Sequence, residues 1–228
     1  MHVAVAPAAT LPRAGIPFGG MPLEISVRAA APVGSVRMLA KDEEIFAEGD
    51  RAAFFYKVIS GAVRTSKLLS DGRRQIDAFH LHGDIFGLEA GREHRFSAEA
   101  VGDVQLIAYR RSRLSALIEE DAAFRDRIMT ATLRSLQRAQ DHMMLLGRKT
   151  AQEKLATFLL DMAERLSDDD EHFDLPMQRS DIADHLGLTI ETVSRTLTQF
   201  ARSGLIRLLP AGRSIGLCNK MALRSLNA

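Results

Sequence analysis

The sequence predicts an α+β fold in three consecutive parts: an antiparallel β-roll, one long helix, and a compact helical unit closed by short strands. Three observations support this prediction. Glycines punctuate short apolar runs between residues 38 and 109, apolar side chains then recur at helical spacing, and a second helical pattern with a central glycine follows after residue 175. The 228 residues, 46% of them hydrophobic, suffice to bury a core for such a fold.

The composition excludes several classes of protein. Thirty basic residues face 29 acidic ones, and this net charge of +1 excludes a uniformly basic DNA-coating protein but not a local basic surface. One cysteine, Cys218, excludes an internal disulfide and a cysteine-ligated cluster, which fits a reducing cytoplasm. No apolar run is long enough to span a bilayer, and the basic start of a signal peptide is missing, so we expect a cytoplasmic protein with no membrane partner.

The first part of the chain is expected to hold a flexible arm and then the roll. Five of the seven prolines lie in the first 32 residues, a stretch with few ways to bury area, so residues 1–34 are predicted to form the arm. Glycines at positions 49, 61, 72 and 83 then recur every 11 or 12 residues, between β-type runs at 54–59, 75–79 and 104–109. Such regular punctuation predicts the antiparallel roll over residues 35–120.

A long helix is predicted over residues 121–147, and its pattern indicates a dimer. Alternating spacings of three and four place six residues on one seam, as in a coiled coil: Met129, Thr132, Leu136, Ala139, Met143 and Leu146. Four apolar residues off the seam are expected to pack onto the roll: Phe124, Ile128, Leu133 and Leu145. Two apolar faces favour homodimerisation, whereas burial of both faces within one chain is the alternative.

Residues 148–228 are predicted to form a winged helix–turn–helix unit after a hinge at 147–150. In the segment 179–197, Ala183 is small enough for two helices to cross closely, Gly187 supplies the turn, and Thr189 can cap the second helix. The buried side of that helix is expected to comprise Ile190, Val193, Leu197, Phe200 and Ala201. Residues 205–209 and 214–217 then predict a β-hairpin wing.

The start of the second helix carries side chains suited to reading DNA bases. Glu191, Ser194 and Arg195 are expected to be exposed there, where a recognition helix faces the major groove. Arg195 can bind O6 and N7 of guanine, Glu191 can accept from cytosine N4, and Ser194 can contact a base or the backbone. The alternative is a Glu191–Arg195 ion pair that only stabilises an exposed helix.

Phosphate contacts are expected from residues near helix N-termini or beside the groove. The candidates are Arg179, Ser180, Thr189, Thr192, Arg207 and Arg213. Residues 175–228 hold seven basic and three acidic side chains, a local net charge of +4 that the whole-chain balance conceals.

These features resemble the Crp/Fnr superfamily of bacterial transcription regulators over nearly the whole chain after residue 35. The segment Glu191-Thr192-Val193-Ser194-Arg195 matches the Glu-x-x-Ser-Arg pattern of the Fnr and FixK types, whereas the cyclic-AMP receptor has glycine in place of Ser194. With the preceding Leu175-Pro176-Met177, it is most similar to the FixK type. The resemblance implies a cyclic-nucleotide-binding-like roll, a homodimer, and a TTGAT-N4-ATCAA palindrome read by Glu191, Ser194 and Arg195. It also implies activation through contact with RNA polymerase, in low-oxygen or nitrogen-fixation gene control.

Effector binding is where the sequence departs from these relatives. The cysteines that hold the oxygen-sensing cluster of Fnr are missing. The phosphate cassette of the cyclic-AMP receptor, Gly-Glu-Leu and then Arg-Ser, is here Gly87-Leu88-Glu89 and then Arg95-Phe96-Ser97. Because Phe96 separates the arginine from the serine, the ligand phosphate loses its partner. We therefore expect no small-molecule effector and no cofactor.

A haem- or ligand-gated sensor is the alternative, because His80, His82 and His94 lie in the roll. Each is expected to be a surface or turn residue, so no metal site is predicted. Cys218 is expected to be a small core residue. The sequence shows no nucleophile–base set, phosphate loop or metal-ligand cluster, so we expect no enzymatic activity.

Overall fold

The computed structural model describes residues 34–167, 172–209 and 214–226. The predicted arm lies outside the described residues except for Gly34, which begins the first strand. The predicted phosphate-contacting residue Arg213 also lies outside them.

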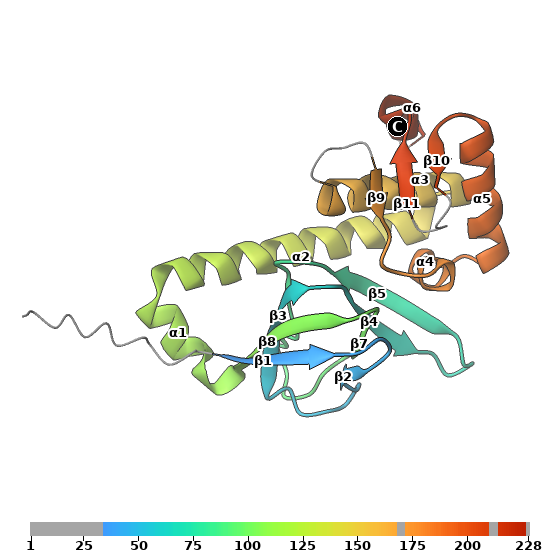
Figure 1. The fold of residues 1–228 in the computed structure, drawn as a ribbon. Coiled ribbons are helices and arrows are strands. Elements are labelled where there is room, and N and C mark those ends of the chain that lie inside the picture. The colour runs from blue at the N-terminus through green and yellow to red at the C-terminus, as the bar shows by residue number, and fades with distance from the viewer. Residues whose placement is uncertain (1–33, 168–171, 210–213, 227–228) are drawn as a thin grey trace, which may run out of the picture. The chain divides into compact units, whose positions relative to one another are not determined.

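The roll consists of two antiparallel sheets, one with the strand order β1-β8-β3-β6 and the other with the order β2-β7-β4-β5 (Figure 1). Their strands are β1 Gly34–Leu39, β2 Glu44–Phe46, β3 Phe54–Ser60, β4 Val63–Leu68, β5 Arg74–His80, β6 Ile85–Phe86, β7 Ser97–Ala100 and β8 Val104–Arg110. The three β-type runs of the sequence fall on β3, β5 and β8, so their prediction is confirmed.

The glycines that punctuate the roll are turn residues. Gly61 and Gly72 have φ angles of 81° and 85°, a region that other residues avoid because the Cβ atom meets the backbone. Gly61 is also required for space, because an added Cβ atom would collide with the carbonyl oxygen of Asp103. Gly72 has open space around it, so only its backbone conformation favours glycine.

The interior of the roll is apolar because alternate residues of each strand point inward. Val58, Val63 and Leu106 are fully buried there. Phe86 packs against Tyr56 and Phe46, with ring centroids 5.3 and 6.2 Å away. This core makes the roll a rigid support for the helix that follows.

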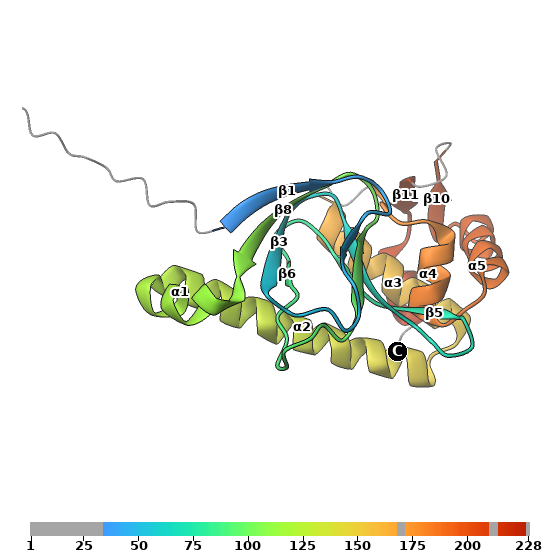
Figure 2. The ribbon, with the colours of Figure 1, turned by 90° about the horizontal axis from the view of Figure 1, so that it is seen from below.

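Three helices follow the roll after a short 3-10 turn at Arg111–Arg113: α1 Leu114–Glu120, α2 Ala122–Arg148 and α3 Ala151–Leu166. Figure 2 shows α2 running along the roll, with α1 at one end and the C-terminal unit at the other. The side chain of Asp121 caps α2 by accepting from the Phe124 N–H at 2.9 Å. A capping box of Thr150 and Glu153 begins α3 directly after α2 ends.

The face of α2 toward the roll was predicted in part. Phe124, Ile128 and Leu145 are buried, as expected, whereas Leu133 is 58% exposed. The prediction that Leu133 packs onto the roll is wrong because it lies five residues after Ile128. Five residues turn a helix by about 140°, which moves Leu133 away from the roll.

The C-terminal unit contains α4 Arg179–Leu186, α5 Ile190–Arg202 and α6 Lys220–Ser225, with a sheet of β9 His172–Asp174, β10 Ile206–Leu208 and β11 Ser214–Leu217. β10 and β11 form the predicted wing, and β9 pairs with the other edge of β11. Sequence reasoning missed β9 and α6 because both are too short for a periodic signal. The predicted α+β class, with its roll, long helix and winged helix–turn–helix, is confirmed.

One apolar core continues from the roll into the C-terminal unit. It includes Ile76 and Phe79 of β5, Leu155 and Leu159 of α3, and Leu186 of α4. None of the helices in the described part of the chain is long and apolar enough to cross a membrane.

Candidate nucleic-acid interface

The helix–turn–helix forms because each local signal in the segment agrees with the others. Ala183 is buried at the crossing of α4 and α5, and Gly187 makes the turn with φ of 62° and ψ of 43°. The Thr189 hydroxyl accepts from the Thr192 N–H at 3.2 Å and so caps α5. These three structural predictions are confirmed, and they fix the direction in which α5 leaves the turn.

The predicted base-reading residues lie together on the first turns of α5. Glu191 and Arg195 are exposed, and Ser194 is half-buried between them. Among the described residues, no ion pair within 4 Å joins Glu191 to Arg195, so the alternative, in which the two side chains only pair with each other, is not formed. Both side chains are therefore accessible to a ligand from solvent.

The carboxylate of Glu191 is a hydrogen-bond acceptor. Its own backbone N–H and the Thr189 hydroxyl donate to it, and these bonds, with the nearby Arg195 charge, hold the pKa of Glu191 below its usual range. An ionised carboxylate accepts but does not donate, and this suits an amino group such as cytosine N4.

The predicted phosphate-contacting residues flank this surface. Arg179 and Ser180 open α4, and the Arg179 guanidinium donates to the Ser194 hydroxyl at 3.4 Å. Thr189 is exposed and Thr192 half-buried at the start of α5, with hydroxyl groups 3.1 Å apart. Arg207 is exposed on β10. The positive ends of the helix dipoles at the starts of α4 and α5 add to the attraction for an anion.

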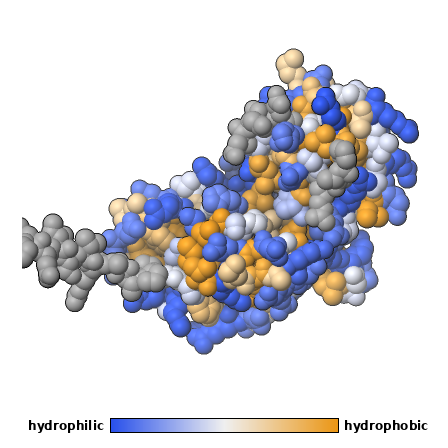
Figure 3. Space-filling model, in the orientation of Figure 1, coloured by the Kyte–Doolittle hydropathy of each residue, from blue (hydrophilic) through white to orange (hydrophobic). Residues whose placement is uncertain are grey.

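A shallow hollow extends this surface along α5. Besides Ser194 and Arg195, it is lined by Thr198, Gln199, Arg202 and Ser203. Sequence reasoning missed Arg202, although its spacing of seven residues from Arg195 is the signal for the same helix face. Figure 3 shows mostly hydrophilic residues along the outer side of α5, as a charged ligand requires.

Two expectations for this unit are wrong. Ile190, predicted to be buried, is exposed because it is the first residue of α5 and lies beyond the edge of the core. Cys218, predicted to be a core residue, is exposed where the chain leaves β11. The polar Thr196 is buried, and its hydroxyl donates to the Thr192 carbonyl at 2.8 Å, which satisfies it.

The histidines of the roll also differ from expectation. His94 is buried and stacks on Phe46 with ring centroids 3.6 Å apart. Burial lowers the pKa of His80 to about 4, and its ring lies 3.1 Å from the Thr65 hydroxyl. Only His82 is the predicted turn residue, with Nδ1 2.6 Å from the Ile59 carbonyl. The described segments hold no group of three or more His, Cys, Asp or Glu side chains that could bind a metal ion.

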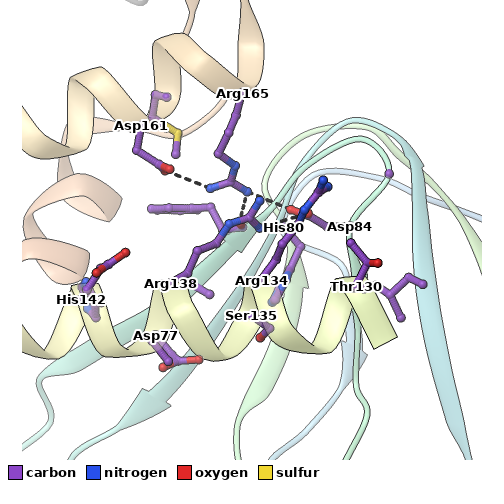
Figure 4. Close-up of a pocket in the computed structure, with 18 of the residues that line it drawn as sticks. Asp77, His80, Asp84, Thr130, Arg134, Ser135, Arg138, His142, Asp161 and Arg165 are labelled. Carbon is purple, nitrogen blue, oxygen red and sulfur yellow. Dashed lines mark hydrogen bonds and ion pairs between the residues drawn. The ribbon is translucent and has the colours of Figure 1, made fainter. Parts of the chain in front are cut away.

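A cavity of about 930 Å³ lies beside the roll, between β5, α2 and α3 (Figure 4). At its centre, Asp84 pairs with Arg138 at 3.0 Å and with Arg165 at 2.8 Å. Burial opposes ionisation of Asp84, but the Leu81 N–H and the two arginines hold its pKa below the usual range. Arg165 also binds Asp161 at 3.1 Å, so the two arginines at this point are already neutralised.

Comparisons with known proteins agree with this geometry. Residues 153–226 match a family described as a Crp-like helix-turn-helix domain, and residues 36–121 match a cyclic nucleotide-binding domain. The nitrogen fixation regulation protein FixK of Azorhizobium caulinodans is 46% identical over 87% of this chain and 81% of the relative. FixK of Rhizobium meliloti is 42% identical over 90% and 94% of the two chains.

Solved structures show the same relationship. FixK2 from Bradyrhizobium japonicum superposes with a TM-score of 0.80 and 47% identity, covering 86% of this chain and 98% of that one. A CooA mutant from Carboxydothermus hydrogenoformans, 22% identical with a TM-score of 0.73, shares the fold over 86% and 88% of the two chains. These relatives are regulators and not enzymes, which agrees with the prediction of no enzymatic activity. The chain belongs to the FixK family of DNA-binding transcription regulators, which carry a Crp-like helix-turn-helix domain.

Proposed function

We propose that this protein is a homodimeric FixK-type activator that binds a TTGAT-N4-ATCAA-type palindrome without a small-molecule effector. Its target genes are those of low-oxygen metabolism or nitrogen fixation, and the FixK relatives, which are nitrogen fixation regulation proteins, support the second of these. It acts in the cytoplasm, has no membrane partner, and activates by contact with RNA polymerase. One observation carries the proposal: Glu191, Ser194 and Arg195 stand together, unpaired with one another, at the exposed start of α5.

The three base-reading residues suit the proposed target. Arg195 presents its guanidinium to the O6 and N7 atoms of guanine, and Glu191 accepts from the amino group of the cytosine on the other strand. Each half-site of the palindrome contains one such G·C pair. Arg179, Ser180, Thr189, Thr192, Arg207 and Arg213 supply the phosphate contacts that position α5 in the groove.

The dimer is formed through α2. Met129, Leu136 and Met143 of the seam are exposed large apolar residues, and Leu133 and Met144 extend the same surface. Thr132 and Ala139 are exposed between them, whereas Leu146 is partly buried against the core of its own chain. A soluble protein rarely exposes such a row along one helix unless a partner covers it. A two-fold axis through α2 then places two recognition helices about 34 Å apart.

The proposed division of the chain follows from these roles. Residues 1–34 form the arm, 35–120 the roll, 121–147 the dimerisation helix, and 148–228 the DNA-binding domain. The last three parts have distinct roles: the roll supports α2, α2 meets a second copy of the chain, and the last part meets DNA.

Effector-free action is supported by the state of the phosphate cassette. The Glu89 carboxylate lies 3.6 Å from His94 Nδ1 and accepts from the Arg95 backbone N–H at 3.4 Å. The Arg95 side chain is exposed, and Phe96 is half-buried in the position between the arginine and the serine. The adjacent arginine and serine that hold the phosphate in the cyclic-AMP receptor are therefore separated here, which supports effector-free action.

A ligand-gated regulator is the second candidate, and the cavity beside the roll favours it. Its volume of about 930 Å³ is within the range of small-molecule sites. Titration with haem, followed by the Soret band and by DNA affinity, distinguishes the two candidates. A stoichiometric complex that changes DNA affinity supports gating and contradicts effector-free action.

The test of the main proposal is a fluorescence-anisotropy titration of the purified protein, in air, without ligand. The TTGAT-N4-ATCAA duplex is compared with a scrambled duplex of equal length at one salt concentration near physiological strength. We expect the palindrome to bind at least 1,000-fold more tightly. Equal affinity for the two duplexes contradicts the proposed specificity.

A further inference from the structure

Two arginines of the roll hold the first helix of the helix–turn–helix. Arg74, at the start of β5, lies 2.6 Å from the Asp181 carboxylate and 2.8 Å from that of Asp184. Arg64, on β4, lies 3.4 Å from Asp181. Residues more than 100 positions apart in the sequence therefore form one charged cluster, which we call the Arg–Asp latch: Arg64 and Arg74 of the roll with Asp181 and Asp184 of α4.

The central residues of the latch are buried and held by several partners, unlike the ion pairs of an exposed, flexible surface. The Asp181 side chain is only 5% exposed, and that of Arg64 is 9% exposed. Glu99 at 2.7 Å and Asp42 at 3.0 Å hold Arg64 from the other side, which fixes its direction. Buried charges with several partners are rigid because any displaced partner leaves a charge without compensation.

Polar contacts beside the latch continue the same junction. The Gln75 side chain donates to the His185 carbonyl at 3.2 Å, and His185 Nδ1 lies 3.2 Å from the Ile76 carbonyl. Strand β5 therefore contacts both the first and the last turn of helix α4. Since Ala183 and Gly187 fix α5 against α4, the contact with the roll also sets the direction of the recognition helix.

We propose that the Arg–Asp latch holds α5 in the orientation that binds DNA. In an effector-gated regulator, binding of the ligand is what produces that orientation. This inference rests on the proposed function. Two half-sites bind together only if both recognition helices keep a fixed direction relative to α2. In the latched structure Glu191 and Arg195 are exposed, so the latch leaves the reading surface free. A protein that spends only a fraction of its time in the competent orientation loses affinity by that fraction.

Arg74→Glu is the variant that opens the latch. It reverses the charge of a side chain that is 28% exposed. Arg64 is less suitable because it is too buried to alter without disturbing the core. Asp181 is less suitable because it also caps α4 by accepting from the Gln178 N–H. The double variant Arg74→Glu/Asp184→Arg restores the original net charge and the pair between positions 74 and 184, while Asp181 keeps Arg64 and has the new arginine three residues further along the same helix. Arg73→Glu is the matched control because it makes the same charge change on the same hairpin. The partner of Arg73 is Asp71 of its own turn, and its side chain is 77% exposed.

Distance measurements between two spin labels report the orientation directly. The exposed Cys218 takes one label, and Ser112→Cys, at an exposed position beside the roll, takes the other. Labelled chains are diluted with unlabelled Cys218→Ser chains, so that only distances within one chain are seen. We expect one narrow distribution for the parent protein and for Arg73→Glu, a broad one for Arg74→Glu, and a narrow one again for the double variant.

Anisotropy with the palindrome gives the functional result. Relative to Arg73→Glu, Arg74→Glu is expected to bind about tenfold more weakly, and the double variant is expected to return to the parent affinity. A narrow distribution for Arg74→Glu overturns the inference, as does palindrome binding by Arg74→Glu that equals or exceeds that of Arg73→Glu. If the parent protein does not distinguish the palindrome from a scrambled duplex, the proposed function fails, while the distance distributions still decide whether the latch exists.

Discussion

The proposed dimer surface gives the sharpest quantitative prediction, through the substitution Leu136→Asp at the centre of the exposed apolar row on α2. Leu136 is 56% exposed. Full burial of a leucine side chain is worth roughly 1.5–3 kcal/mol, so covering its exposed part contributes about 1–1.5 kcal/mol. A two-fold interface uses each residue twice, which gives about 2–3 kcal/mol per dimer.

The substitution is therefore expected to raise the dimer dissociation constant by about 30- to 150-fold, since each 1.4 kcal/mol is a factor of about ten. Two carboxylates facing each other near the axis add to this loss. Sedimentation velocity over a range of protein concentrations measures the constant, and circular dichroism checks that the helix remains folded.

Arg134→Gln is the matched control. Arg134 is exposed, and about 200° of helix rotation separates it from Leu136 and carries it to the side of α2 that lines the cavity. The substitution makes the same change of one unit in net charge on the same helix without touching the exposed apolar row. If Leu136→Asp dissociates no more readily than Arg134→Gln, α2 is not the dimer interface and the reasoning is refuted.

Three further predictions concern DNA reading, a turn and pH. Arg195→Ala should reduce the free energy of binding to the palindrome by about 1–3 kcal/mol and flatten the base preference in a binding-site selection. Arg207→Ala should weaken binding to all duplexes equally. An unchanged base preference in Arg195→Ala contradicts a base-reading role for Arg195. Gly61→Ala should destabilise the fold by at least about 2 kcal/mol more than Gly72→Ala in urea unfolding, because both have positive φ but only Gly61 lacks space for a Cβ atom; equal losses would show that backbone conformation alone matters. Burial lowers the pKa of His185 to about 3 and that of His80 to about 4. Their unfolded forms bind protons near pH 6.5, so stability should be full above that pH and fall between about pH 6.5 and 3. Urea unfolding at pH 7 and pH 5 should show this loss, and His185→Gln should reduce it; an unchanged pH dependence in that variant would argue against the buried neutral ring.

Much of the fold could be predicted from local patterns in the sequence. The turn at Gly187, the cap at Thr189 and the small Ala183 were all predictable because each requirement involves residues within one or two turns of a helix. The punctuated strands and the length of α2 were predictable for the same reason. The residues proposed to read bases were identified from their place at the start of α5 and from the resemblance of the segment Glu191-Thr192-Val193-Ser194-Arg195 to a known pattern.

Errors arose where burial depends on the edge of a packed surface. Leu133 and Ile190 are apolar and correctly spaced, yet Leu133 has turned away from the roll and Ile190, the first residue of α5, lies beyond the edge of the core. His94 is polar and was placed on the surface, yet Phe46 and Glu89 provide a buried place for its ring. A sequence pattern gives the face of an element, but not the extent to which a neighbour covers it.

The sequence by itself determined the order of the elements, the helix–turn–helix and the exposed polar side chains at the start of α5, because these depend on contacts between near neighbours in the chain. Only the tertiary structure decided which charged side chains of the roll meet those of the C-terminal unit, how α4 is held against β5, and which apolar residues of α2 remain uncovered. Arg64 meets Asp181 across 117 positions of sequence. Such a contact depends on how separately folded elements pack, and no local period records it.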